Sequence, residues 1–225
     1  MKAKERSALT GDAGTPDAAD IRFLDRDLPS HPVDEVRDIA SRFYGIAGDF
    51  RELPSERDQN FLVDADNGDR FVLKVANAAE TPSGIDFQIG ALRHVATVAP
   101  SVPIPRIVKS RQGLDAHEVC FSNARRHVVY LLTYLDGILL SKSPQPLASA
   151  VHRQLGTLLA DLDIALRGYF HPAAFQEHPW NFETCAQLEP FAGYIGNEGH
   201  LRTVRRVFEH MREVVIPRLR TLRHQ

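Results

Sequence analysis

The chain has 225 residues, of which 43% are hydrophobic, so it can bury a sizeable core in one domain or in two small lobes. Its formal net charge of −2 gives no general attraction to nucleic acid. No apolar run approaches the ~18 residues that a membrane-spanning helix needs, so we expect neither a nucleic-acid nor a membrane partner.

The two cysteines, Cys120 and Cys185, are too few for a disulfide framework and fit no metal-ligand spacing. We expect both to be buried thiols. Because the polar N-terminus also lacks a secretory signal, we expect a cytoplasmic protein.

The N-terminal third of the chain predicts an arm, a helix and a hairpin. Residues 1–28 are polar without an apolar period, which predicts a flexible arm. A helical period begins at Val33 and ends before Gly45. Asn67-Gly68 indicates a β-hairpin turn. Short strands are expected over 50–53, 61–65 and 70–76.

A single lysine in the third of these strands is the most informative feature of the chain. Strand alternation places Lys74 on the same face as Val72 and Ala76, and opposite to Leu73 and Val75. A lysine on an apolar surface suits a flat apolar ligand with an anionic end, such as a nucleoside with its phosphates. The alternative is a lysine that reaches solvent from an edge strand.

A helix is expected from Pro82 to about Thr97, with proline at its first position. Its apolar face carries one polar residue, Gln88, and a buried amide needs a hydrogen-bond partner. Lys74 on the adjacent strand would be such a partner. The alternative is a glutamine at the helix margin that binds the backbone.

Two connecting segments are also candidates for ligand contacts. The loop 54–60 has no glycine, but Ser55 and Asn60 can bind phosphate together with backbone N–H groups; a plain polar loop is the alternative. After strands over 118–121 and 127–133, the segment 131–137 ends in a turn at glycine. A hinge strand here would offer unpaired backbone groups to a purine, unless it is an ordinary connection to a helix.

From Leu147 almost to its end the chain has a helical pattern, with a final long helix from His200 that is expected to bend at Pro217. The sequence therefore predicts an α+β fold: a small antiparallel-sheet lobe with one helix over 29–135, and the first helices of a helical lobe over 136–225.

The order of these features resembles the aminoglycoside phosphotransferase family of kinase-like enzymes, from about Phe23 to the C-terminus. The segment 178–181, His-Pro-Trp-Asn, is similar to a Trp-Asp turn in the branch that contains hydroxylysine kinases. That branch also includes kinase domains fused to an aminotransferase. The most specific matching pieces are 53–61 (Leu-Pro-Ser-Glu-Arg-Asp-Gln-Asn-Phe), 71–74 (Phe-Val-Leu-Lys), 134–137 (Tyr-Leu-Asp-Gly) and 155–160 (Leu-Gly-x-x-Leu-Ala).

The resemblance implies a protein kinase-like fold that binds ATP, with Mg²⁺ in the intact enzyme. It assigns the α- and β-phosphates to Lys74 and part of the adenine ceiling to Val72. The adenine hinge would be the stretch containing Leu132, Tyr134 and Leu135.

The resemblance also implies two further assignments, one of them at a position where this chain departs from the family. Gln88 stands where many members place a glutamate that pairs with the lysine, and a neutral amide orients an ammonium less strongly than a carboxylate does. Trp180 and Asn181 are assigned to the wall of the acceptor site.

The sequence has neither the catalytic-loop pattern His-x-Asp-x-x-x-x-Asn nor the later metal-binding aspartate that phosphoryl transfer needs in such enzymes. The resemblance thus implies a kinase truncated before its catalytic loop, with no catalytic residue or metal ligand in this chain. We expect the intact protein to phosphorylate a small hydroxyl or amino-alcohol metabolite, with an aminotransferase domain or a dimer as further expectations. The alternative is a non-catalytic nucleotide-binding or regulatory module that ends naturally at Gln225.

Overall fold

The computed structural model describes residues 28–143, 145–175, 185–219 and 221. These residues form two units, one containing residues 28–175 and the other containing residues 185–221, apart from the positions left out. The expected flexible arm lies outside the described residues except for its last position, Leu28.

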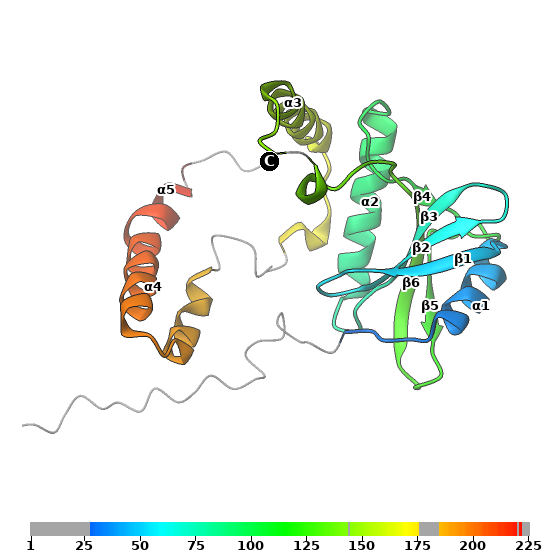
Figure 1. The fold of residues 1–225 in the computed structure, drawn as a ribbon, viewed down its shortest axis with the longest axis horizontal. Helices are drawn as coiled ribbons and strands as arrows, with labels where there is room; N and C mark the ends of the chain where they lie inside the picture. Colours follow the sequence, from blue (N-terminus) through cyan, green and yellow to red (C-terminus); the bar gives the residue numbers. More distant parts are fainter. Residues whose placement is uncertain (1–27, 144, 176–184, 220, 222–225) are drawn as a thin grey trace, which may run out of the picture. The chain divides into compact units, whose positions relative to one another are not determined.

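Six antiparallel strands form one sheet in the order β1-β2-β3-β6-β4, with β5 also paired to β6 (Figure 1). Because β3 lies between β2 and β6, Lys74 is on a central strand, and the edge-strand alternative is wrong. The expected hairpin turn is confirmed, and Gly68 has the positive φ of 87° that such a turn uses. The strands are β1 (Gly48–Leu53), β2 (Gln59–Ala65), β3 (Arg70–Val75), β4 (Ile107–Val108), β5 (Ala116–Cys120) and β6 (Arg126–Thr133).

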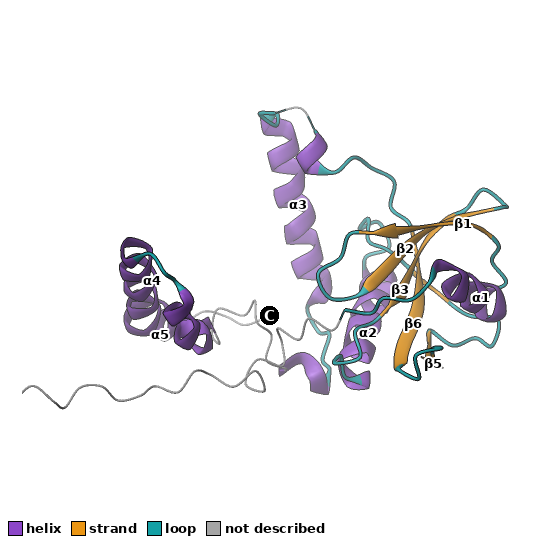
Figure 2. Cartoon of the chain, turned by 60° about the horizontal axis from the view of Figure 1, so that its bottom comes forward, coloured by secondary structure: helices purple, strands orange, loops and turns teal. Residues whose placement is uncertain are grey.

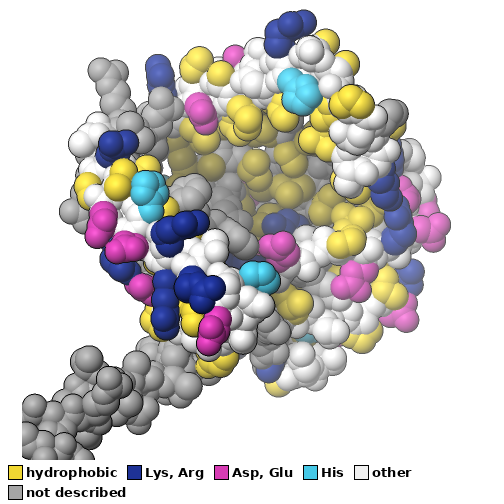
Figure 3. All heavy atoms as spheres, turned by 60° about the vertical axis from the view of Figure 1, so that its left-hand side comes forward, with side chains coloured by type: hydrophobic (Ala, Val, Ile, Leu, Met, Phe, Trp, Pro, Cys, Tyr) yellow, Lys and Arg dark blue, Asp and Glu magenta, His cyan; other side chains and the backbone are white. Residues whose placement is uncertain are grey.

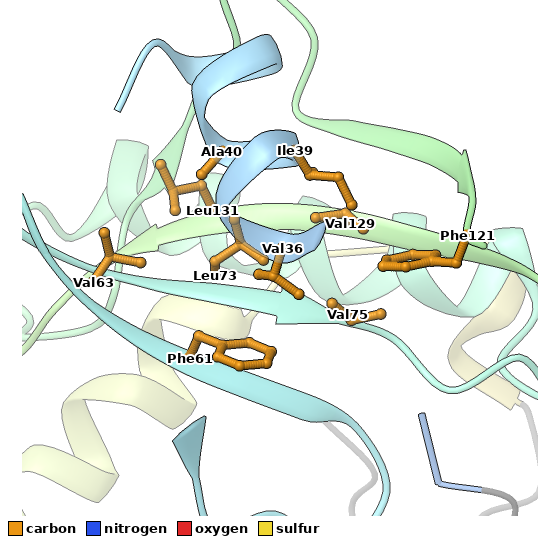
Figure 4. Packing of buried hydrophobic residues seen from close by; sticks show 10 residues of the cluster. All are labelled: Val36, Ile39, Ala40, Phe61, Val63, Leu73, Val75, Phe121, Val129 and Leu131. Carbon is orange, nitrogen blue, oxygen red and sulfur yellow. The ribbon is translucent and has the colours of Figure 1, made fainter. Parts of the chain in front are cut away.

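Helix α1 (Val33–Tyr44) covers one face of the sheet. It ends where predicted, since Gly45 adopts a left-handed conformation with φ 69° and its N–H bonds to carbonyls of the last turn. The helix and sheet share a core of side chains that are almost all fully buried (Figure 4). This core contains Val36, Ile39 and Ala40 of α1 with Phe61, Val63, Leu73, Val75, Phe121, Val129 and Leu131.

Helix α2 (Pro82–Val98) packs on the opposite face, so a helix covers each side of the sheet (Figures 1 and 2). Thr81 is its N-cap residue, and the threonine hydroxyl oxygen accepts a hydrogen bond from the Gly84 N–H at 3.0 Å. Its buried residues Ile85 and Ile89 contact a second cluster that contains Ala76, Tyr130 and Leu132.

Helix α3 (Ser149–Leu166) packs its C-terminal half against α2, through Ala165 and Val95 among others. The chain then turns back so that the Tyr169 hydroxyl donates to the Phe87 carbonyl at 2.8 Å. Glycine at position 90 leaves room for this approach, because a Cβ there would overlap the tyrosine oxygen and would displace the end of that side chain. A 3₁₀ turn, Pro172–Phe175, follows.

The second unit is helical. A 3₁₀ segment, Cys185–Tyr194, precedes α4 (Glu198–His210), and a π-helical turn, Met211–Val215, joins α4 to α5 (Ile216–Leu219). The irregularity thus lies one turn before Pro217, because a proline lacks the N–H for the preceding turn and its ring collides with that turn's carbonyl. An ion pair between Arg212 and Glu189 joins the helix to the 3₁₀ segment.

The surface carries two features that the sequence did not indicate. Cys120 is exposed and Cys185 is partly exposed, so the prediction of two buried thiols is wrong; Cys120 ends β5, which pairs with β6 alone. Hydrophobic side chains also reach the surface (Figure 3). Among the exposed ones, Ile138 is 77% exposed and Phe170 is 90% exposed. Over the described ranges, no helix is both long and apolar enough to cross a membrane.

The α1-side core gives a first prediction. Leu73 is fully buried in it, so Leu73→Ala should lower the free energy of unfolding by about 2 to 5 kcal/mol through lost contacts and a cavity. Urea denaturation measures this value. Leu139→Ala removes the same atoms from a side chain that is 65% exposed, and it should change the value by less than about 0.5 kcal/mol. Equal losses in both variants would contradict the core assignment.

Candidate functional site

The strand register brings three polar side chains into one row on the α2 side of the sheet. Asn60 of β2 is opposite Lys74 of β3, and Lys74 is opposite Tyr130 of β6. Residues directly opposite each other on antiparallel strands project from the same face. The neighbouring row on this face contains Leu62, Val72 and Leu132, so the expected apolar surface around the lysine is present.

The lysine ammonium is held by Asp58, a residue of the loop before β2. Lys74 Nζ lies 3.0 Å from Asp58 Oδ2, and each side chain is only about one-fifth exposed, at 21% and 20%. The other carboxylate oxygen, Oδ1, accepts a hydrogen bond from the Asn77 N–H at 3.0 Å. Asn77 in turn is buried, and its side-chain amide donates to the Arg57 carbonyl at 3.0 Å. The loop before β2 is therefore fastened to the segment after β3.

Tyr130 is the second partner of the lysine. Its hydroxyl oxygen hydrogen-bonds to the Lys74 ammonium, and its O–H donates to Gln88 Oε1 at 3.5 Å. Burial raises the pKa of Tyr130, so the phenol is neutral at physiological pH. Tyr130 therefore contributes a hydrogen bond to the ammonium, while the negative charge beside it belongs to Asp58.

The pKa of Lys74 is raised by these partners. Burial by itself opposes the charged form and acts to lower the pKa, but Tyr130 and Asp58 act in the other direction and outweigh it. The ammonium is thus fully protonated at neutral pH. It has three N–H donors, and in the described part of the chain Asp58 and Tyr130 engage two of them.

Gln88 does not have the environment expected of it. The side chain is exposed rather than buried, and its contact is to Tyr130, not to Lys74. The physical reason is that Asp58 approaches the lysine from the sheet's own loop and already provides a charged partner, which binds an ammonium more strongly than an amide does. The predicted direct contact between Gln88 and the lysine is therefore wrong.

The two candidates for phosphate contacts differ. Ser55 is exposed in the loop, whereas Asn60 is partly buried beside the lysine. Within the described residues, the buried Asn60 Oδ1 has no hydrogen-bond partner. A buried polar atom without a partner is costly, and a ligand or water that offers a hydrogen bond at this position would remove that cost.

The hinge is more ordered than expected. Leu132 lies between β3 and β4, so its backbone is not at a sheet edge and only its side chain faces the candidate site. The Tyr134 N–H donates to the Arg70 carbonyl at 3.1 Å and is not available to a purine. The Arg70 guanidinium lies 4.8 Å from the centre of the Tyr134 ring and pairs with Asp136. Of the three predicted hinge residues, Leu135 remains exposed.

The predicted acceptor residues Trp180 and Asn181 lie outside the described residues. Among the residues that the structure does describe, no group of three or more histidine, cysteine, aspartate or glutamate side chains is arranged to hold a metal ion. The candidate site is therefore the row around Lys74, with its apolar neighbours and the hinge.

Sequence reasoning missed Asp58 and Tyr130. The hairpin could have indicated Asp58. A turn at Asn67-Gly68 places residue 60 opposite Lys74, and Asp58 lies two residues before residue 60, close enough to contact the lysine. Tyr130 had no comparable signal, since the pairing of β3 with β6 is between strands more than 50 residues apart.

Comparison with solved structures identifies the fold as protein kinase-like. An amicoumacin kinase, solved with AMP-PNP, Ca²⁺ and Ami, has a TM-score of 0.59 and 12% identity, covering 85% of this chain and 55% of that one. A microcompartment-associated aminopropanol kinase has a TM-score of 0.53 and 23% identity, covering 68% and 46%. At these identities the likeness concerns the fold alone.

Sequence comparison gives the family. Residues 49–215 match the phosphotransferase enzyme family, and the chain belongs to it. It is 29% identical to a hydroxylysine kinase of Danio rerio over 197 residues, which cover 82% of this chain and 54% of that protein. A hydroxylysine kinase of Mus musculus is 27% identical, covering 74% and 48%. The chain thus spans about half the length of these relatives, and the resemblance seen in its sequence is confirmed.

The raised pKa of Lys74 predicts how its contribution to stability depends on pH. A group whose folded-state pKa is above its unfolded value stabilises the fold fully below the unfolded value, and that stabilisation is lost as the pH rises through the folded-state pKa. The difference in unfolding free energy between the wild type and Lys74→Met should therefore stay constant from pH 7 to 9. It should change against the wild type once the pH passes the ordinary lysine value of 10.5.

Urea denaturation across this pH range measures the difference. Lys109→Met is the matched control, because its side chain is 58% exposed and pairs at 3.5 Å with Asp115. A pH-independent difference for Lys74→Met would mean that burial and the partners cancel, and a difference that changes in favour of the wild type as the pH rises would mean that burial outweighs the partners.

Proposed function

We propose that this chain is the nucleotide-binding part of an ATP-dependent small-molecule phosphotransferase. The observation that carries the proposal is the ammonium of Lys74 on a central strand, fixed by Asp58 and Tyr130 and retaining a donor for an anion. A partly buried lysine that is charged at neutral pH and lies next to an apolar row of side chains suits a ligand with a phosphate group and a flat apolar base. Family membership supports the same reading.

In this proposal Lys74 binds the α- and β-phosphates, and Asn60 and Ser55 lie at the phosphate side of the site. Val72 and the side chain of Leu132 form the apolar surface for the base. Because the Tyr134 N–H is already bonded within the sheet, we place the backbone contacts to the base at the Tyr134 carbonyl and at Leu135.

ATP would supply the phosphoryl group, and Mg²⁺ would accompany it in the intact protein, bound in part by phosphate oxygens. The amicoumacin kinase solved with AMP-PNP and Ca²⁺ supports this pairing of nucleotide and divalent ion. The described residues contribute positioning: a fixed ammonium at the phosphates and an apolar surface at the base, both effective in lowering the barrier of an in-line transfer.

The proposed acceptor is a small metabolite with a hydroxyl group, such as an amino alcohol, in the cytoplasm. Two similar proteins are named as hydroxylysine and aminopropanol kinases, and both named compounds carry a hydroxyl and an amino group. Trp180 and Asn181 stay the proposed acceptor-site residues.

The nucleotide site is tested by thermal stabilisation. A nucleotide present at 100 times its dissociation constant should stabilise the chain by about 2.7 kcal/mol, which raises Tm by roughly 5 to 10 °C for a chain of this length. Lys74→Ala should abolish the increase, while Lys109→Ala should retain it. If wild-type protein shows no increase with ATP, ADP or AMP-PNP, with or without Mg²⁺, the proposed function is wrong.

A second measurement concerns turnover. Since the sequence lacks the His-x-Asp-x-x-x-x-Asn pattern, the purified 225-residue chain should bind nucleotide without transferring phosphate to hydroxylysine or 1-amino-2-propanol. Formation of ADP, followed by a coupled assay with each acceptor, detects transfer. Acceptor-dependent turnover that Lys74→Ala removes would show that this chain carries its own catalytic group.

A further inference from the structure

We infer that Asp58 is the positioning residue for Lys74, a role for which Gln88 on the helix facing the sheet was the candidate from the sequence. The inference rests on the proposed nucleotide site and adds to it a residue that sets the geometry of its phosphate-binding lysine. Three observations carry it: the contacts of both carboxylate oxygens, the charges around the ammonium, and the neutral residue at position 88.

The first observation is that Asp58 is itself fixed. One oxygen contacts Lys74 Nζ at 3.0 Å and the other accepts the Asn77 N–H at 3.0 Å, so the carboxylate cannot rotate without losing a contact. The Asn77 side chain also accepts the Ala79 N–H at 2.9 Å and donates to the Arg57 carbonyl. These bonds connect the loop before β2 to the residues after β3, so the carboxylate is part of the sheet's own framework.

The second observation is that the other groups near the ammonium do not provide its negative charge. Tyr130 is neutral because its pKa is raised, and Gln88 is an amide that contacts the tyrosine. Glu80 lies on the same side but is 3.5 Å from the Arg57 guanidinium, which balances its charge. In the described part of the chain, Asp58 is the carboxylate paired with Lys74.

The third observation is that Asp58 and Gln88 contact different residues: Asp58 contacts Lys74, and Gln88 contacts Tyr130. With a carboxylate already on the lysine, position 88 needs only an acceptor for the Tyr130 O–H, and an amide oxygen is sufficient. A glutamate there would add a second negative charge near the ammonium and weaken its attraction for phosphate. Because Asp58 is on the sheet's loop, the ion pair forms whatever the position of α2, and the lysine is oriented before nucleotide arrives.

The direct test is the pKa of Lys74, which does not depend on any ligand. The chain has only five lysines, so ¹³C-lysine labelling gives few signals, and Lys74→Arg identifies the one of interest. We expect Asp58→Asn to lower the pKa of Lys74, because the charge and the charged hydrogen bond of Asp58 are lost while burial still acts against the ammonium. Gln88→Ala should leave it almost unchanged, and Asp58→Glu should restore part of the wild-type value.

A second test measures nucleotide binding by titration. We expect Asp58→Asn to reduce the ratio of ADP affinity to adenosine affinity by about tenfold, since a lysine without its anchor loses its fixed geometry at the phosphates. Gln88→Ala should reduce the ratio much less. If Gln88→Ala shifts the lysine pKa or the ratio as much as Asp58→Asn does, or if Asp58→Asn changes neither, the inference is wrong.

Different results would overturn the proposed function and the role of Asp58. Absence of nucleotide binding by the wild type overturns the proposed function, whatever the lysine titration shows. Normal binding by the wild type together with an unchanged Lys74 pKa in Asp58→Asn overturns the role of Asp58 alone. Far-ultraviolet circular dichroism and the urea midpoint of each variant show that it is folded, so that a lost response is assigned to the site.

Discussion

A charged lysine in the middle of a sheet is the constraint around which the sheet-bearing unit is organised. Burial of the Lys74 ammonium costs free energy unless a charge and hydrogen bonds compensate for the lost water. Asp58 provides a charge and a hydrogen bond from the loop before β2, and Tyr130 provides a hydrogen bond from β6. The loop before β2, the register of β2 with β3, and the pairing of β3 with β6 are therefore all needed to keep one side chain charged.

The two faces of the sheet accordingly differ in composition and in how completely their polar atoms are hydrogen-bonded. The α1 face is a dense core of fully buried aliphatic and aromatic side chains, and it gives the strands their fixed positions. The α2 face contains smaller apolar residues between polar ones, with an unpartnered buried oxygen on Asn60 among the described residues. Stability is thus concentrated on one side, and the other side can hold groups whose contacts are incomplete until a ligand binds.

Much of the fold follows from local patterns in the sequence. The periods of α1, α2 and the longer strands, the cap at Gly45 and the Asn67-Gly68 turn depend on neighbouring residues, and they were predictable for that reason. The two-residue strand β4 is too short to show a period. The face of β3 that bears Lys74 followed from alternation alone, and the structure confirms it.

The details of the site depended on contacts that no local pattern contains. Asp58 contacts the lysine through the register of the hairpin, and Tyr130 does so through pairing with a distant strand. Gln88 was assigned by its place on a helix face, but a helix can rotate or tilt by a fraction of a turn and expose such a side chain. Unpaired backbone groups were expected along the hinge strand, with an ordinary connection as the alternative, whereas the Arg70 carbonyl accepts a hydrogen bond from the Tyr134 N–H.

The contact between Gly90 and Tyr169 has a consequence for how this chain can vary. The tyrosine oxygen occupies the space of a side chain at position 90, and its O–H is bonded to the backbone of α2. The two positions therefore form a linked pair: a relative with alanine at position 90 must have a smaller or displaced residue at position 169. Alanine at position 90 would displace the end of the Tyr169 side chain, and loss of the tyrosine hydroxyl would remove its bond to the Phe87 carbonyl, so we expect the two positions to change together.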